Sequence, residues 1–173
     1  MLVNAVYGFT AILFKIINEY KPGAIAVAFD VSGGTFRDTL YAAYKAQREK
    51  KPQELYDQLV PIKKILDACA IPFFEKKGFE ADDVIGSIVH TMNSTHKDWY
   101  VHVVTGDMDT LQLVSEKVSV VSFKKGISDT TFYDEKAVKQ RFELTPKELI
   151  DFKALKGDAS DNIKGVKGIG EKT

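Results

Sequence analysis

Two hydrophobic periodicities alternate along this chain and divide it into helices and short strands. Apolar residues repeat at helical spacing near the start of the chain, and short apolar runs bounded by turn residues follow at intervals. The spacing predicts helices at residues 4–20, 52–69, 81–89, 111–114, 134–142 and 145–156. It predicts strands at residues 24–29, 71–74, 100–104, 118–123 and 130–133.

Strands that alternate with helices predict an α/β fold, in which helices flank a central and mainly parallel sheet. The length of 173 residues fits one such domain with a small appended module. In parallel sheets of this kind, ligands bind beyond the carboxyl ends of the strands. Residues that follow the predicted strands are therefore the first candidates for a functional site.

Acidic residues recur where a predicted strand ends or a helix begins. The candidate metal ligands are Asp30, Glu80, Asp82, Asp83, Asp107, Asp109, Asp158 and Asp161. Taken singly, each is an ordinary helix-capping or turn residue, because free backbone N–H groups favour a carboxylate. Together they would crowd at one edge of a parallel sheet and repel one another unless cations neutralise them. Hard divalent cations prefer oxygen ligands, so the pattern favours two Mg²⁺ or Mn²⁺ ions that activate water at a phosphodiester.

Charge is balanced over the whole chain but not along it. The chain has 24 basic and 24 acidic side chains, which disfavours a uniformly basic DNA-coating protein. Residues 35–51, however, carry five basic and two acidic side chains, a net charge of +3, with tyrosines between them. Basic groups contact phosphates and aromatic rings stack on unpaired bases, and the spacing of Tyr44 and Arg48 predicts one shared helical face. A solvated surface helix is the alternative that this segment alone leaves open.

The end of the chain is a second basic segment. Residues 162–173 carry three lysines and one glutamate, a net charge of +2. The glycines predict a hairpin whose backbone can approach a partner closely and whose N–H groups could hold a phosphate. The candidate DNA contacts in this segment are Lys164, Gly165, Lys167, Gly168, Gly170 and Lys172.

The remaining composition narrows the class of protein. The only cysteine, Cys69, follows an apolar helical pattern and is expected to be buried, and no disulfide is possible within the chain. The three histidines lack zinc-ligand spacing with it. No apolar run is long enough to span a membrane, and the start lacks the features of a signal peptide, so a cytoplasmic protein is expected.

Taken in order, these segments resemble the 5′-nuclease domain of bacterial DNA polymerase I and, more broadly, the flap-endonuclease family. The likeness covers nearly the whole chain. The matching stretches are residues 4–9, 27–30, 36–37, 44–48, 80–83, 105–109, 111–113, 157–162 and 165–170.

The resemblance implies a PIN-like or resolvase-like nuclease core at residues 1–144 and an incomplete helix-hairpin-helix module at residues 145–173. It also implies that the eight acidic residues form a two-metal cluster. Residues 35–51 are similar to a helical arch. The arch residues that the resemblance makes catalytic are Arg37, Lys45 and Arg48, and those that it makes DNA contacts are the same three with Tyr44. The final segment would grip duplex DNA, with a K⁺ ion at the hairpin.

The activity implied by the resemblance is that of a structure-specific 5′-3′ exonuclease and 5′-flap endonuclease. Such an enzyme hydrolyses DNA phosphodiesters by a two-metal-ion mechanism in DNA replication and repair. Its expected partners are DNA with a 5′ flap or 5′ end and a fused or separate DNA polymerase, with no membrane involved.

The sequence departs from the family pattern in three ways. The family begins with an apolar strand that ends in Asp-Gly, whereas this chain starts where the next segment begins. It also ends at Thr173, inside the hairpin motif, and has Lys164 and Lys167 where the family often has prolines. An alternative is therefore a truncated, catalytically impaired module that binds branched DNA. Sheet type and carboxylates alone also fit a Mg²⁺-dependent phosphatase, which has no use for the basic segment or the glycine hairpin.

Overall fold

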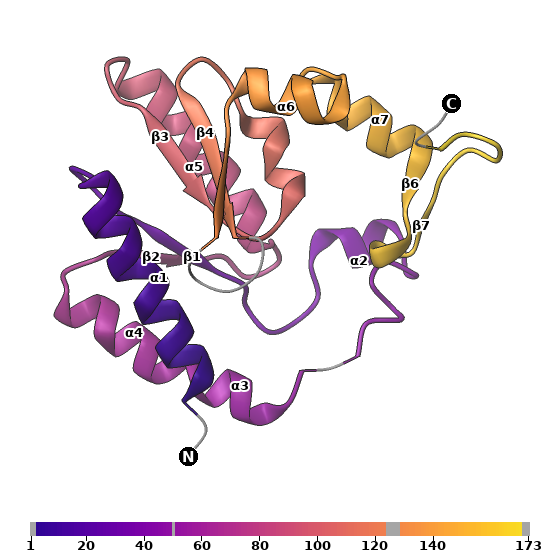
Figure 1. Cartoon of the computed structure of the whole chain (residues 1–173). Coiled ribbons are helices and arrows are strands. Elements are labelled where there is room, and N and C mark those ends of the chain that lie inside the picture. Colours follow the sequence, from indigo (N-terminus) through magenta and orange to yellow (C-terminus); the bar gives the residue numbers. More distant parts are fainter. Residues whose placement is uncertain (1–2, 50, 124–128, 171–173) are drawn as a thin grey trace.

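The computed structural model of this chain describes residues 3–49, 51–123 and 129–170 (Figure 1). The α-helices of this part are α1 (Asn4–Tyr20), α2 (Phe36–Leu40), α3 (Gln53–Asp57), α4 (Leu59–Ala68), α5 (Ala81–Thr95), α6 (Glu135–Phe142) and α7 (Glu148–Lys156). The 3₁₀ helices are η1 (Met108–Leu113) and η2 (Ala159–Asp161). The strands are β1 (Val27–Phe29), β2 (Phe73–Glu75), β3 (Val101–Val104), β4 (Val118–Phe123), β5 (Thr130–Tyr133), β6 (Gly157–Asp158) and β7 (Ile163–Lys164).

The core strands pair mainly in parallel, and helices pack on them. β1 pairs in parallel with β2, and β3 pairs in parallel with β4, whose other edge pairs antiparallel with β5. β6 and β7 form a separate antiparallel ribbon. The predicted α/β class is confirmed, with one difference in detail. The parallel strands belong to two sheets, since no hydrogen-bonded ladder joins β1 or β2 to β3 within the described ranges.

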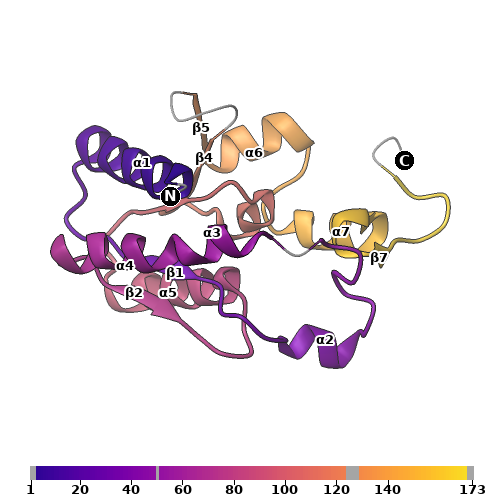
Figure 2. The ribbon, with the colours of Figure 1, turned by 90° about the horizontal axis from the view of Figure 1, so that it is seen from below.

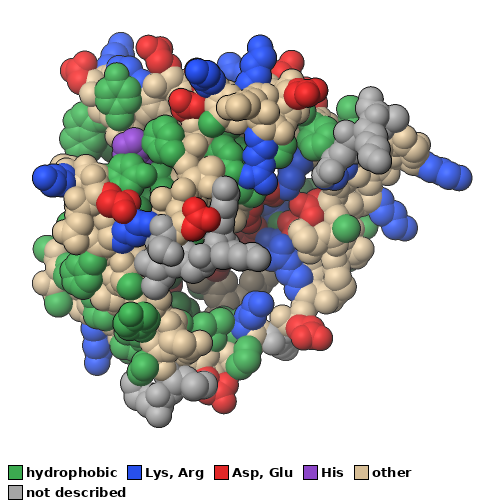
Figure 3. Space-filling model, in the orientation of Figure 1, with side chains coloured by type: hydrophobic (Ala, Val, Ile, Leu, Met, Phe, Trp, Pro, Cys, Tyr) green, Lys and Arg blue, Asp and Glu red, His purple; other side chains and the backbone are tan. Residues whose placement is uncertain are grey.

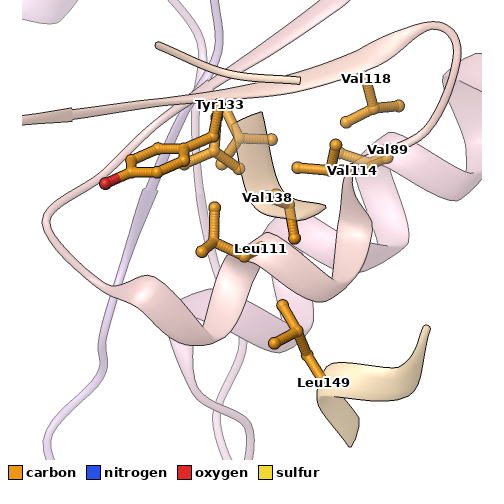
Figure 4. Close-up of a cluster of buried hydrophobic side chains, with 9 residues drawn as sticks. Val89, Leu111, Val114, Val118, Tyr133, Val138 and Leu149 are labelled. Carbon is orange, nitrogen blue, oxygen red and sulfur yellow. The ribbon is translucent and has the colours of Figure 1, made fainter. Parts of the chain in front are cut away.

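Each parallel pair has its own hydrophobic core. The larger core packs α5, η1, α6 and α7 against β3, β4 and β5, and Figure 4 shows its side chains converging. The smaller core packs α1 and α4 against β1 and β2. Leu66, Val120 and Val138 are 0% exposed, and burying one such side chain contributes about 1.5–3 kcal/mol. These two cores fix the positions of the strand ends from which the site is built.

Two segments leave the sheets on the same side of the molecule. Figures 1 and 2 show α2 and the α7–β7 segment both extending away from the strands and approaching each other at their far ends. In the described part of the chain, no helix combines the length and apolar character that crossing a membrane requires.

The predicted burial of Cys69 is wrong. Cys69 is exposed and forms the C-cap of α4, which ends one residue earlier at Ala68. Ala70 then adopts a left-handed backbone conformation with φ of 54°. Cys69 thus lies where the chain leaves the helix and not on its buried face.

Two glycines allow the backbone of the C-terminal hairpin to approach the end of α7. A Cβ atom on Gly165 would overlap the Lys156 carbonyl group, and one on Gly157 would overlap the backbone nitrogen of Gly165. Gly157 also has a φ of 79°, which glycine adopts without strain. Beside this contact, the Val166 N–H donates a hydrogen bond of 2.7 Å to the Leu155 carbonyl.

We expect Gly165→Ala to weaken this hairpin, because the added methyl group meets backbone atoms that cannot rotate away. The expected cost is about 1–3 kcal/mol, as for other overpacked positions. It would be measured as faster amide hydrogen exchange in residues 157–166 and a lower unfolding midpoint.

The matched control is Gly8→Ala, at a glycine inside α1 with open space around it. That change should stabilise the chain by about 0.5–1 kcal/mol, because alanine loses less backbone entropy in a helix. Unchanged hairpin exchange in the Gly165 variant would contradict the close backbone contact.

Candidate active site

The acidic residues predicted from the sequence lie at the ends of the strands and at the starts of helices. Asp30 follows β1, and the first turn of α5 carries Asp82 and Asp83. Asp107 caps η1 after β3, where its carboxylate accepts the Asp109 N–H at 2.9 Å. The term acidic rim is used below for Asp30, Glu80, Asp82, Asp83, Asp107 and Asp109.

Asp82 is the most perturbed carboxyl group of the acidic rim. Burial and the negative charges of four neighbours raise the pKa of Asp82 to about 6. In order of effect, the neighbours are Asp107, Asp30, Glu80 and Asp109. Carboxylates from three separate segments are thus close enough to repel one another, a repulsion that a bound cation would relieve.

Two basic residues of the predicted arch are paired with the acidic rim. Arg37 donates two hydrogen bonds to the Asp83 carboxylate, both 2.7 Å long, in the bidentate arrangement that arginine favours. This contact raises the pKa of Arg37 and lowers that of Asp83, so both groups stay charged. Lys45 Nζ donates to Glu80 Oε2 at 2.8 Å. Burial alone would lower the pKa of Lys45, but hydrogen bonds to Glu80 and Tyr44 raise it.

The predicted helical face of Tyr44 and Arg48 is wrong. α2 ends at Leu40, and residues 42–47 form consecutive turns in which Lys45 has a left-handed φ of 53°. A left-handed residue interrupts the helical path, so side chains four positions apart no longer stack above one another. Tyr44 is buried, only 9% exposed, and in this conformation its ring is not available to stack on a base.

Residues 41–48 are instead held against the turn at residues 159–162, an interaction that we call the clasp. The Lys45 N–H donates to the Asp161 carbonyl at 3.0 Å, and the Asn162 side-chain amide donates to a backbone carbonyl of the first segment at 2.8 Å. The Arg48 guanidinium pairs with the Asp161 carboxylate. The clasp therefore brings predicted arch residues and predicted metal ligands together from opposite ends of the chain.

Lys153 is a site residue that the sequence reasoning missed. Its Nζ donates to Asp158 Oδ2 at 3.0 Å and also to Asp109 Oδ1. Bonds from Ser160 and Lys153 lower the pKa of Asp158 to about 2. Burial alone would lower the pKa of Lys153, but its two carboxylate partners raise it. A lysine in the last turn of a helix is also common for dipole reasons, so local spacing could not single it out.

A cavity of about 270 Å³ lies between the clasp and the acidic rim. Its charged lining residues are Asp30, Asp38, Lys45, Arg48 and Glu80. Figure 3 shows acidic and basic side chains meeting around a hollow at the centre of this face. Cations and anions thus line the same space, as a site for a phosphate and its counter-ions requires.

The donor atoms fit a hard divalent cation in chemistry but not in their present positions. Carboxylate oxygens are the ligands that Mg²⁺ and Mn²⁺ prefer. Across the described residues, however, no three His, Cys, Asp or Glu side chains lie close enough together to hold one metal ion. Several of the carboxylates are held by lysine and arginine instead, so the predicted ligand set stays a prediction.

The predicted C-terminal DNA contacts run from β7 into the segment after it, in which Gly165 packs against the end of α7. Lys164 and Lys167 are exposed, next to the half-exposed side chain of Val166. Gly168 has a φ of 88°, which only glycine adopts readily. Lys172 lies outside the described residues. The segment presents charge and backbone to solvent, and its contact with DNA stays a prediction.

Comparisons with protein families define the class. A model for the N-terminal resolvase-like domain of 5′-3′ exonucleases matches residues 1–143, and one for their C-terminal SAM fold matches residues 144–173. The two matches together span the whole chain. The chain belongs to the 5′-3′ exonuclease family, which sets aside the phosphatase alternative.

Curated relatives of this chain include bacterial DNA polymerases I. The chain is 46% identical to that of Bacillus subtilis (strain 168) over 171 residues, which is 98% of this chain and 19% of the relative. It is 45% identical to that of Mycobacterium leprae (strain TN) over 173 residues, with the same 19% of the relative covered. The chain thus spans about a fifth of the length of the curated relatives that it matches.

Solved nuclease structures have the same fold. A T5 5′-exonuclease with bound zinc has a TM-score of 0.76 at 27% identity, covering 97% of this chain and 64% of that one. A bacteriophage T5 flap endonuclease in complex with DNA and metal ions also has a TM-score of 0.76 at 27% identity, covering 99% and 64%. The catalytic core of Rad2 with DNA, at 20% identity and a TM-score of 0.61, covers 98% and 50% and shows the fold alone.

The raised pKa of Asp82 predicts how stability depends on pH without metal. The pKa near 6 lies above the ordinary aspartate value of about 4, so the folded state binds a proton more tightly than the unfolded state. This contribution to stability is present below pH 4 and is lost as pH rises through 6. In chelator, we expect the free energy of unfolding to fall by about 1 kcal/mol between pH 4 and pH 8. This value is reduced for solvent screening, because the site is only half-buried.

Asp82→Asn should remove that loss and leave the chain more stable than wild type at pH 8 in chelator. Thermal unfolding between pH 4 and pH 8 measures the effect, with Asp67→Asn at the exposed end of α4 as the control. A pH profile that Asp82→Asn leaves unchanged would show that the rim carboxylates do not repel one another.

Proposed function

We propose that this chain hydrolyses phosphodiester bonds at or near the 5′ end of DNA, as a 5′-3′ exonuclease and 5′-flap endonuclease that uses two divalent metal ions. Family membership supports the nuclease chemistry. The observation that carries the proposal is that acidic and basic side chains line one cavity. One of these basic groups, Arg48, also pairs with Asp161 from the C-terminal part of the chain. The carboxylates suit cations, and the basic groups suit the phosphates of a nucleic acid.

The ions in this proposal are Mg²⁺ or Mn²⁺, held by the acidic rim with Asp158 and Asp161. When bound, such ions supply activated water and stabilise the leaving oxygen of the phosphodiester. The chain itself supplies Arg37, Lys45 and Arg48, whose positive charges would neutralise the phosphate near the bond that is cut. In the present structure these three groups face carboxylates, so they have to exchange an acidic partner for a phosphate.

The second part of the proposal concerns the grip on DNA away from the bond that is cut. Lys164, Lys167 and Lys172 would contact backbone phosphates. The backbone around Gly168 would hold a further phosphate, either directly through its N–H groups or through a K⁺ ion bound to its carbonyl oxygens. A fused or separate DNA polymerase is the partner that the relatives suggest, and replication and repair are the matching setting. The expected cytoplasmic location stays a prediction.

The test is cleavage of a DNA duplex with a labelled 5′ flap in the presence of Mg²⁺. Asp107→Asn and Asp82→Asn should each slow cleavage by more than about a hundredfold, since even outer partners of a metal site cost 10–100-fold. Binding of the flap DNA, measured by fluorescence anisotropy, should change little. Asp67→Asn serves as the control for loss of a carboxylate elsewhere.

Cleavage at wild-type rates by both variants would remove the metal assignment of the acidic rim. The spacing of the carboxylates keeps one alternative in view, because no three of them are close enough to hold an ion in the part described. A branched-DNA-binding module predicts tight binding without metal and no product after long incubation. The same assay therefore separates the two functions.

A further inference from the structure

Lys153 places its ammonium group between two carboxylates. Its ammonium group bridges Asp109 and Asp158, which lie 49 positions apart in the sequence, and bonds both. A single positive charge shared by two carboxylates offsets repulsion that would otherwise push the carboxylates apart.

The bridge also joins the two matched parts of the chain. Asp109 lies in the first turn of η1, in the part that matches the N-terminal resolvase-like domain, whereas Asp158 lies in β6, in the C-terminal part. Lys153 extends from α7, which contacts η1. Replacing the Lys153 ammonium group between Asp109 and Asp158 would therefore change the contact that joins the two parts.

The bridge is open to exchange. The Lys153 side chain is 42% exposed, and the Asp109 and Asp158 side chains are 36% and 21% exposed, so a hydrated ion can reach all three. A hollow of about 340 Å³ lies beside the bridge and gives the lysine room to move. Lys153 and Asp158 are among the residues that line it.

We propose that Lys153 is the resident counter-ion of the metal-free protein, and that a divalent cation displaces its ammonium group from Asp109 and Asp158. This inference rests on the proposed function in one respect, the binding of divalent ions at these carboxylates. It makes Lys153 a positioning residue. The lysine keeps the site assembled without metal, and it lowers the affinity for metal because the two cations compete for the same oxygens.

The test compares Lys153→Gln with wild type in two measurements on the full chain. In chelator, the variant should unfold at a temperature lower by about 2–4 °C, because two carboxylates lose their shared partner. With saturating Mn²⁺, the difference should vanish or reverse. Mn²⁺ binding, followed by electron paramagnetic resonance of the free ion, should be about two- to fivefold tighter, the range that partly exposed ion pairs imply.

Two further variants separate this role from simpler ones. Lys153→Arg keeps the charge and the bridge, so it should behave like wild type in both measurements. Lys147→Gln, at the exposed start of α7, removes the same charge from the same helix away from the bridge and should leave Mn²⁺ affinity unchanged. Equal tightening in Lys147→Gln would reduce the effect to net charge and overturn the proposal.

The remaining outcomes also decide whether a cation displaces Lys153. A Lys153→Gln chain that is unfolded in chelator but folds when Mn²⁺ is added supports the exchange, whereas one that stays equally destabilised with Mn²⁺ shows a purely structural lysine. Unchanged Mn²⁺ affinity in that variant overturns the inference and leaves the proposed nuclease intact. A wild-type chain that binds no Mn²⁺ overturns both.

Discussion

The constraint on which the rest of this structure depends is electrostatic: carboxylates gathered at one edge of the fold need positive charge beside them. Parallel strands bring their carboxyl ends to the same edge, and this chain has acidic residues after three of them. The strain is visible at Asp82, whose pKa rises to about 6 under burial and the charges of its neighbours. Basic side chains pair with neighbouring carboxylates, namely Glu80, Asp83, Asp109, Asp158 and Asp161.

The compensation comes from two segments that lie far apart in the sequence. Residues 37–48 supply Arg37, Lys45 and Arg48, and α7 supplies Lys153. Both segments leave the sheets on one side and meet in the clasp, so charge pairing and chain path reinforce each other (Figure 1). The same basic groups also suit phosphate. The phosphates of a nucleic acid can therefore compete with the carboxylates for these groups.

The sequence predicted the scaffold well because periodicity reports burial directly. α1, β4 and β5 have the bounds that the apolar spacing indicates, and the capping box at Thr145 and Glu148 forms both of its reciprocal hydrogen bonds. The parallel pairing places acidic residues at the same edge within each sheet, whereas the approach of the two sheets depends on helix packing. These are local or topological properties, which a single chain carries in its pattern of residue types.

Contacts between segments far apart in the sequence could not be predicted from the pattern of residue types. The left-handed turn at Lys45 is stabilised by a backbone bond to Asp161, and nothing in the spacing of residues 41–48 announces a partner more than a hundred residues away. The bridge made by Lys153 is hidden for the same reason. The exposure of Cys69 likewise depends on where α4 ends and not on its apolar repeat.

The most direct measurement is an anomalous difference map from a crystal of this chain soaked in Mn²⁺. If these carboxylates bind divalent cations, one peak will lie among Asp30, Asp82 and Asp107 of the acidic rim. A second peak will lie between Asp109 and Asp158, with the Lys153 side chain moved aside. Peaks elsewhere on the surface, or none at a concentration that supports cleavage, would contradict cation binding at these carboxylates.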